Sequence, residues 1–184
     1  MIAIYVIIAI VIILIIMMVA MYNGLVRLRN QVKNAWSQID VQLKRRHDLI
    51  PNLVETAKGY MKHERETLES ITQARSHAVE ASGVANQAKA EGELSNALSR
   101  FMLVVENYPD LKASQNFLAL QEELSSTENK VGFSRQFYND QVQSFNTRIE
   151  SFPTNIMAGM FNFKQAEFFE IETPAERDVP KVQF

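Results

Sequence analysis

The chain has 184 residues, 47% of them hydrophobic, and its 19 basic and 21 acidic side chains nearly cancel. This length suits one sizeable core, and the balanced charge lacks the overall positive excess typical of nucleic-acid-binding proteins. The absence of cysteine excludes disulfide bonds, thiolate metal sites and cysteine nucleophiles. Only 6 glycines and 5 prolines interrupt the sequence, which favours long helices over many short strands.

The first segment predicts a membrane-spanning helix. From Ile2 to Met21 every residue is apolar or Tyr, and the first charged side chain is that of Arg27. About 20 residues, each rising ~1.5 Å, cover the roughly 30 Å hydrocarbon core of a bilayer. A cleaved signal peptide would have a basic start and a shorter apolar run, so we expect an uncleaved anchor over residues 1–22.

The charges next to this segment predict its orientation. No Lys or Arg precedes the span, whereas Arg27, Arg29 and Lys33 follow it before the first acidic residue, Asp40. Positively charged flanks stay on the cytoplasmic side of a membrane. We therefore expect a single-pass protein with its N-terminus outside and its soluble part in the cytoplasm.

Apolar residues at helical spacing predict a long helix after the span. One seven-residue frame contains Leu25, Val32, Ile39, Leu53 and Tyr60, and Trp36, Leu43, Ile50 and Ala57 lie beside it. Because Leu68, Ile71 and Ala74 continue the pattern, we expect this helix to reach about residue 80 and to end at Ser82 and Gly83. Arg46 occupies the same apolar frame, so its charge must pair or reach solvent.

Two further helices are predicted downstream. A second stripe, formed by Leu94, Leu98, Phe101, Val105 and Tyr108, stops at Asn107 to Pro109, where a third helix begins. In that third helix apolar residues recur every seven positions, at Phe117, Leu124, Val131, Tyr138, Phe145 and Phe152. A strict seven-residue repeat indicates neighbouring helices packed nearly parallel or antiparallel.

The predicted fold is therefore all-α, an N-terminal transmembrane helix followed by an elongated antiparallel bundle of three to four helices with coiled-coil-like packing. The bundle covers residues 23–169. Pro153 ends the third helix, and a short apolar stretch from Ile156 to Phe163 follows it. Residues 170–184 contain Pro174 and Pro180 without periodicity, so we expect an extended tail.

No catalytic or metal site is predicted. His63 and Glu64 begin an HExxH pattern, but Thr67 stands where the second metal ligand would be. Asp40, Lys44 and His47 share one helical face, for which solvated ion pairing is favoured over an acid–base relay. We expect no cofactor and no small-molecule substrate.

The densest basic run, Lys44 to His47, predicts either a solvated face or a surface for a protein partner. Five residues after Arg46, Pro51 cannot donate to the carbonyl of His47, so we expect a kink and an exposed acceptor there. The candidate interaction residues are Trp36, Lys44, Arg45, Arg46, His47, Asp48 and Pro51.

Four stretches of the sequence are distinctive: AWSQIDVQLKRRHDLIPNLVETAKGY from Ala35 to Tyr60, YNGLVRLRN before it, MAGMFNFKQAEFFE from Met157 to Glu170, and the closing PKVQF. Together they resemble the LemA family of bacterial membrane proteins. The resemblance implies an anchored, elongated helical bundle at the bacterial inner membrane. It implies no enzymatic activity.

Two functions remain open. The first is a homo-oligomeric structural assembly at the bacterial inner membrane that contributes to envelope organisation, with the lipid bilayer and other copies of the chain as partners. The alternative is an adaptor or regulatory module for a membrane enzyme such as a protease, which would be its membrane-protein client. The size of the extracted particle distinguishes them.

Overall fold

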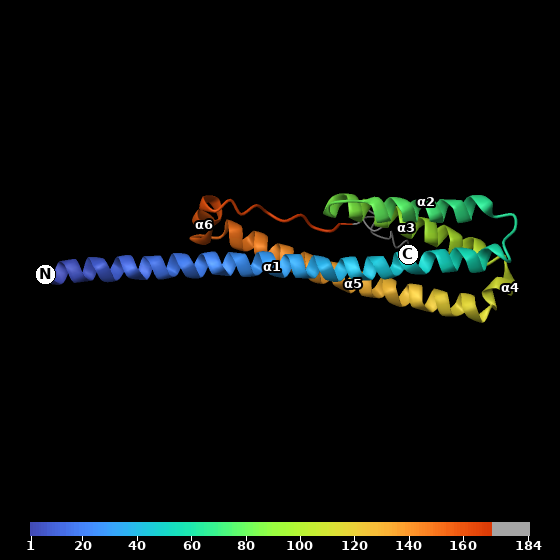
Figure 1. Ribbon diagram of the computed structural model, residues 1–184, viewed down its shortest axis with the longest axis horizontal. Coiled ribbons are helices and arrows are strands. Elements are labelled where there is room, and N and C mark those ends of the chain that lie inside the picture. Colours follow the sequence, from blue (N-terminus) through green and yellow to red (C-terminus); the bar gives the residue numbers. More distant parts are fainter. Residues whose placement is uncertain (171–184) are drawn as a thin grey trace, which may run out of the picture. The chain divides into compact units, whose positions relative to one another are not determined.

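In the computed structural model, residues 1–170 are described, and this range forms six α-helices and no strand. The helices are α1 (Ile2–Lys58), α2 (Arg65–Glu80), α3 (Val84–Val105), α4 (Pro109–Lys112), α5 (Gln115–Glu150) and α6 (Thr154–Met160) (Figure 1). The predicted all-α fold with a long apolar N-terminal helix is confirmed. Nearly all of the predicted tail, residues 171–184, lies outside the described range.

The chain divides into two compact units. Unit 1 comprises Met1–Gln38 and Ser134–Glu167, and unit 2 comprises Ile39–Phe133 with the segment that begins at Phe168. Helices α1 and α5 each contribute a stretch to both units. The division into an anchor, a body and a tail at residues 1–22, 23–169 and 170–184 stays a prediction.

In unit 1 the free part of α1 gives way abruptly to packed helix. Side chains from Met1 to Ala20 are exposed, burial begins at Met21 and Tyr22, and Leu25 is fully buried. Farther along α1, the Trp36 ring makes an edge contact with Tyr138 of α5, with ring centres 5.4 Å apart. An exposed run of apolar residues is stable in lipid rather than in water. The residues at which this run ends are those at which packing against the rest of unit 1 begins.

The chain after α6 returns along α5 and is held by side chains of that helix. The Asn146 amide donates to the Ala166 carbonyl at 2.9 Å and accepts from the Ala166 N–H at 2.9 Å. The Tyr138 hydroxyl donates to the Glu167 carbonyl at 2.8 Å. These bonds satisfy backbone groups that no regular ladder satisfies. Burial, and then the nearby Glu167 charge, raise the pKa of Tyr138 above its usual value.

Unit 2 is a helical bundle in which parts of α1 and α5 pack with α2 and α3. Helices α2 and α3 run antiparallel and are in direct contact (Figure 1). Its core is aliphatic with a few rings, and it contains Ile50, Leu53, Ile71, Leu94, Phe101, Leu111 and Phe117 among others. The Phe101 and Phe117 rings tilt toward each other with centres 6.2 Å apart. Short turns after α2 and α3 let neighbouring helices bury their apolar faces together.

The prediction of one helix continuing to about residue 80 is wrong. Helix α1 ends at Lys58, and α2 starts separately at Arg65. The N–H groups of Tyr60 and Met61 both bond to the Ala57 carbonyl at 2.9 Å, which closes the helix before the turn. Reversal of the chain lets α2 bury its stripe against α3, which a straight helix would leave in solvent. Tyr60, predicted on the core face, is 44% exposed because the helix has already ended.

The seven-residue frame of α5 is confirmed over five positions. Phe117, Leu124, Val131, Tyr138 and Phe145 are each at most 7% exposed. The prediction that the sixth position, Phe152, belongs to the same buried frame is wrong, because this residue is 81% exposed. Helix α5 ends at Glu150, so Phe152 no longer shares its periodicity. The third helix predicted from Pro109 is divided into the short α4 and the long α5.

We predict that Val131→Asp will strongly lower the melting temperature of the chain, whereas Lys130→Asp will leave it nearly unchanged. Val131 is 3% exposed, and the residue directly before it, Lys130, is exposed. An aspartate in the core costs several kcal/mol unless it is paired. Circular dichroism melting of the detergent-solubilised chain measures the effect, and equal melting of both variants would show that this frame is not the core.

Candidate functional site

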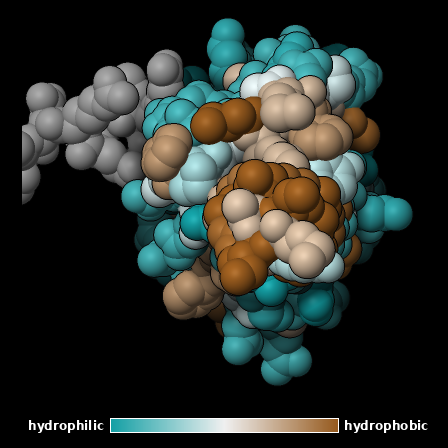
Figure 2. All heavy atoms as spheres, turned by 90° about the vertical axis from the view of Figure 1, so that its left-hand side faces the viewer, coloured by the Kyte–Doolittle hydropathy of each residue, from teal (hydrophilic) through white to brown (hydrophobic). Residues whose placement is uncertain are grey.

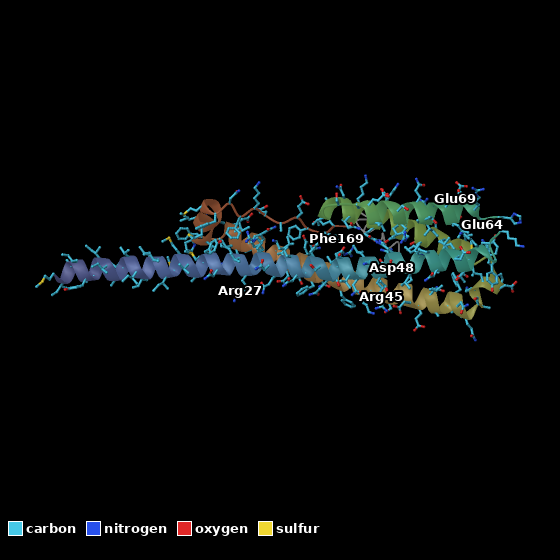
Figure 3. The ribbon with its side chains drawn as sticks, in the orientation of Figure 1. Arg27, Arg45, Asp48, Glu64, Glu69 and Phe169 are labelled. Atoms are coloured by element: carbon cyan, nitrogen blue, oxygen red, sulfur yellow. The ribbon has the colours of Figure 1, made fainter. Side chains whose placement is uncertain are left out.

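The predicted interaction residues all lie on α1, but they divide between exposed and buried positions. Trp36 belongs to unit 1, where it is half-buried against Tyr138. In unit 2, the exposed members are Lys44, Arg45, Asp48 and Pro51 (Arg45 and Asp48 are labelled in Figure 3). Arg45 forms an ion pair with Glu123 of α5, which leaves part of its side chain in solvent.

Arg46 is buried at the centre of unit 2, with 2% of its surface exposed. Its Nη1 donates to Oε2 of Glu91 at 3.2 Å, and its Nη2 donates to Oγ of Ser95 at 2.9 Å. The same Nη2 lies 3.1 Å from Oε2 of Glu128. Of the two outcomes predicted for Arg46, pairing or access to solvent, the structure shows pairing, and a solvated face is wrong for this residue. A guanidinium in a core requires such acceptors because desolvation of an unpaired charge costs several kcal/mol.

Glu91 of α3 is the second buried charge, and its side chain has no exposed surface. Its carboxylate accepts hydrogen bonds from the Arg46 guanidinium, from the Gln87 amide at 3.0 Å and from Nε2 of His47 at 2.7 Å. His47 is 7% exposed, so the solvated pairing expected for its helical face with Asp40 and Lys44 is wrong. Several donors on one carboxylate meet the requirement that buried polar groups be hydrogen-bonded.

The backbone acceptor released by Pro51 is also used inside unit 2. Arg75 of α2 donates from Nε to the His47 carbonyl at 2.7 Å. Helix α1 continues through Pro51 to Lys58. The prediction that this carbonyl would be exposed is therefore wrong, because a side chain from another helix replaces the missing N–H donor.

Glu91 was not predicted, although the sequence carries a signal for it. Glu91 lies three residues before Leu94 and seven before Leu98, so it falls on the apolar stripe of α3. A carboxylate in one apolar stripe and a guanidinium in another form a complementary pair. Only the identity of the two helices that face each other was missing.

The buried network connects helices rather than presenting reactive groups. Arg46 from α1 joins Glu91 and Ser95 of α3 to Glu128 of α5, all within unit 2. These directional bonds fix the register of three helices, a role for which buried ion pairs are well suited. Residues 1–170 contain no group of three or more His, Asp or Glu side chains able to hold a metal ion.

The family model of the LemA family matches residues 35–184. This chain belongs to the LemA family. It is 30% identical to Protein LemA of Metamycoplasma hominis over 158 residues, which are 85% of this chain and 72% of that protein. It is 27% identical to Magnetosome protein MamQ 2 of Paramagnetospirillum magneticum over an aligned length of 180, and the match covers 84% of this chain and 66% of the relative. Magnetosome protein MamQ of Magnetospirillum gryphiswaldense is 25% identical with the same coverage.

The family match and the N-terminal helix together define a membrane-associated helical protein. Among the described residues, α1 is the helix long and apolar enough to cross a bilayer, and its most apolar window is unburied. This LemA-family chain spans 72% of the mycoplasma relative and 66% of the magnetosome relatives.

We predict that Arg46→Met will lower the free energy of unfolding by about 3–5 kcal/mol, because it leaves a buried carboxylate with too few donors. For a chain of this size, that loss corresponds to a fall of roughly 6–20 °C in melting temperature. Methionine keeps most of the apolar stem, so lost packing contributes little.

The matched control is Arg45→Met, which removes the neighbouring guanidinium from a pair with Glu123. Because Arg45 is 53% exposed, its pair contributes at most about 1 kcal/mol. Circular dichroism melting of both variants in the same detergent compares them directly. A fall no larger for Arg46→Met than for Arg45→Met would mean that the buried network does not stabilise unit 2.

Proposed function

We propose that this LemA-family protein is a non-enzymatic structural component that assembles with copies of itself at the bacterial inner membrane and contributes to organisation of the cell envelope. The observation that carries the proposal is the exposure of large apolar side chains on unit 2. Leu103 is 73% exposed and Phe133 is 74% exposed, whereas the charged side chains of Arg46 and Glu91 in the same unit are buried. Contiguous exposed apolar surface favours protein contacts, and Leu103 lies beside further apolar side chains in one groove.

A groove between α3 and α5 of unit 2 supports contacts between copies. Its volume is about 600 Å³, and its apolar lining includes Leu98, Met102, Leu103 and Leu124. A groove between two helices can accept the apolar side chains of a third helix, as in helix-in-groove recognition. A neighbouring copy would therefore bury Leu103 together with the groove.

Because the anchor confines the copies to one membrane, weak contacts between them are sufficient to hold an assembly together. Chains confined to one membrane meet at a much higher effective concentration than free chains do, so small interfaces can hold an assembly together. The non-enzymatic part of the proposal is supported by Glu91, which has no exposed surface and is occupied by donors of its own bundle. A general acid or base must instead reach its substrate. None of the three relatives' names states a reaction.

An adaptor role is the second candidate, and one surface of α1 favours it. Lys44, Asp48 and Pro51 are exposed at helical spacing in unit 2, directly outside the buried Arg46 and His47. A client membrane protein would contact this face. In that case the extracted chain would be a small species bound to its client.

We predict that gentle detergent extraction will yield a large homomeric particle, measured by light scattering or native mass spectrometry. Leu103→Asp should reduce its mass because a charge on the groove opposes contact with another copy. The matched control is Val79→Asp on α2, since Val79 is 53% exposed and does not line this groove. Both variants should melt like the unmodified chain. A small particle containing a different protein would support the adaptor role instead.

We also propose that the N-terminus lies outside and the soluble part in the cytoplasm, because Arg27 and Arg29 follow the span before any acidic residue, and such basic flanks stay on the cytoplasmic side (Arg27 is labelled in Figure 3). A reporter fused after Phe184 tests this orientation. Alkaline phosphatase, which functions only outside the cytoplasm, should be inactive there, and green fluorescent protein should be bright. An active phosphatase fusion would reverse the proposed topology.

A further inference from the structure

The corner between α5 and α6 in unit 1 exposes a cluster of large apolar side chains. Phe152 is 81% exposed, Ile156 55%, Met160 69% and Phe161 52%. Ile156 and Met160 lie four residues apart on α6 and therefore share one face of the helix. The other face of α6 is buried, through Thr154, Met157 and Ala158.

This cluster lies beside the point where the anchor ends. The Tyr22 ring is 4.7 Å from the Phe161 ring and 5.9 Å from the Phe163 ring, measured between centres. Along α1, burial by the protein begins at Met21 and Tyr22. Figure 1 shows α6 next to α1 where the free N-terminal stretch of α1 ends, and the view along the anchor shows apolar side chains close to it (Figure 2).

The depth of the cluster follows from the span. If the apolar residues Ile2 to Met21 fill the roughly 30 Å hydrocarbon core, Tyr22 lies in the interfacial layer, which is about 5–8 Å thick on each side. Tyr is enriched at this level of membrane proteins. The Phe161 ring, 4.7 Å from that of Tyr22, then lies at the interface too.

The charges around the cluster fit the same environment. Residues 151–163 contain no charged side chain, although Glu150 precedes them and Lys164 follows. On α1, the Arg29 guanidinium lies 5.0 Å from the centre of the Phe163 ring, so a positive charge lies beside the aromatic rings of Tyr22, Phe161 and Phe163. Apolar side chains bordered by cations are typical of elements that lie in the plane of a membrane interface near anionic lipid headgroups.

We propose that the α5–α6 corner inserts Phe152, Ile156, Met160 and Phe161 into the interfacial layer of the bilayer, next to the point where the anchor leaves it. The chain is then attached to the membrane at two places, through the spanning helix and through this corner. Two attachment points restrict rotation of unit 1 about the anchor axis, which one helix alone would permit. The proposal requires the anchor but not self-assembly.

The test uses the absence of cysteine from this chain, which allows single-site labelling. Ile156→Cys and Met160→Cys are prepared in the full-length protein, and each is labelled with an environment-sensitive fluorophore. The control is Gln136→Cys, an exposed site of α5 in unit 1 that lies roughly 20 Å along the helix from its α6 end. Because all three side chains are exposed, the variants should melt like the unmodified protein.

The labelled proteins are reconstituted at low protein-to-lipid ratio into vesicles of phosphatidylcholine and phosphatidylglycerol. Quenching is measured with iodide in the water and with a lipid carrying a nitroxide near the top of its acyl chain. We expect the nitroxide lipid to quench the labels at 156 and 160. Iodide should quench these two labels several-fold less than it quenches the label at 136. The low ratio isolates single chains, so this result does not depend on the proposed assembly.

Two results would overturn the proposal. Labels at 156 and 160 as accessible to iodide as the label at 136 would place the corner in water. Labels protected from both quenchers would mean that protein, such as a second copy, covers these side chains. In the latter case, loss of protection on further dilution into lipid would identify the cover as another chain.

Discussion

The ion pair between Arg46 and Glu91 is the interaction on which the arrangement of unit 2 depends. Glu91 has no exposed surface and Arg46 is 2% exposed, so each charge depends on its protein partners rather than on water. Nη2 of the guanidinium also contacts Ser95 and Glu128. In a low-dielectric interior such groups tolerate little displacement, because a lost partner costs several kcal/mol. The pair therefore selects one register of α1, α3 and α5.

The same turn of α1 is connected to α2 through its backbone. Pro51 leaves the His47 carbonyl without its helical donor, and Arg75 provides one from α2. Thus a side-chain charge and a backbone acceptor, adjacent in sequence, fix α1 against different neighbours. Unit 1 is organised otherwise, by aromatic contacts and by side-chain bonds from Tyr138 and Asn146 to the returning chain. The polar network specifies the register of the helices in unit 2. In unit 1, aromatic and hydrogen-bonding contacts pack the chain against α1 where the apolar anchor ends.

Local and periodic features were readable from the sequence because they depend on neighbouring residues. The apolar length from Ile2 to Met21 indicates a span by itself, and the frame from Phe117 to Phe145 identified the buried positions of α5. The frame failed at Phe152, beyond the end of the helix, where periodicity no longer determines direction. It failed also after Lys58, because an apolar stripe looks alike whether the chain continues straight or turns back.

The sequence by itself determined that this chain has an apolar anchor, an α-helical body and a charge at Arg46 that must either pair or reach solvent. Only the tertiary structure decided that Arg46 pairs with Glu91 within the core, and that Phe161 meets Tyr22. The physical reason is separation along the chain. Both contacts join residues on different helices, and helical periodicity specifies which face of a helix is buried but not which helix covers it.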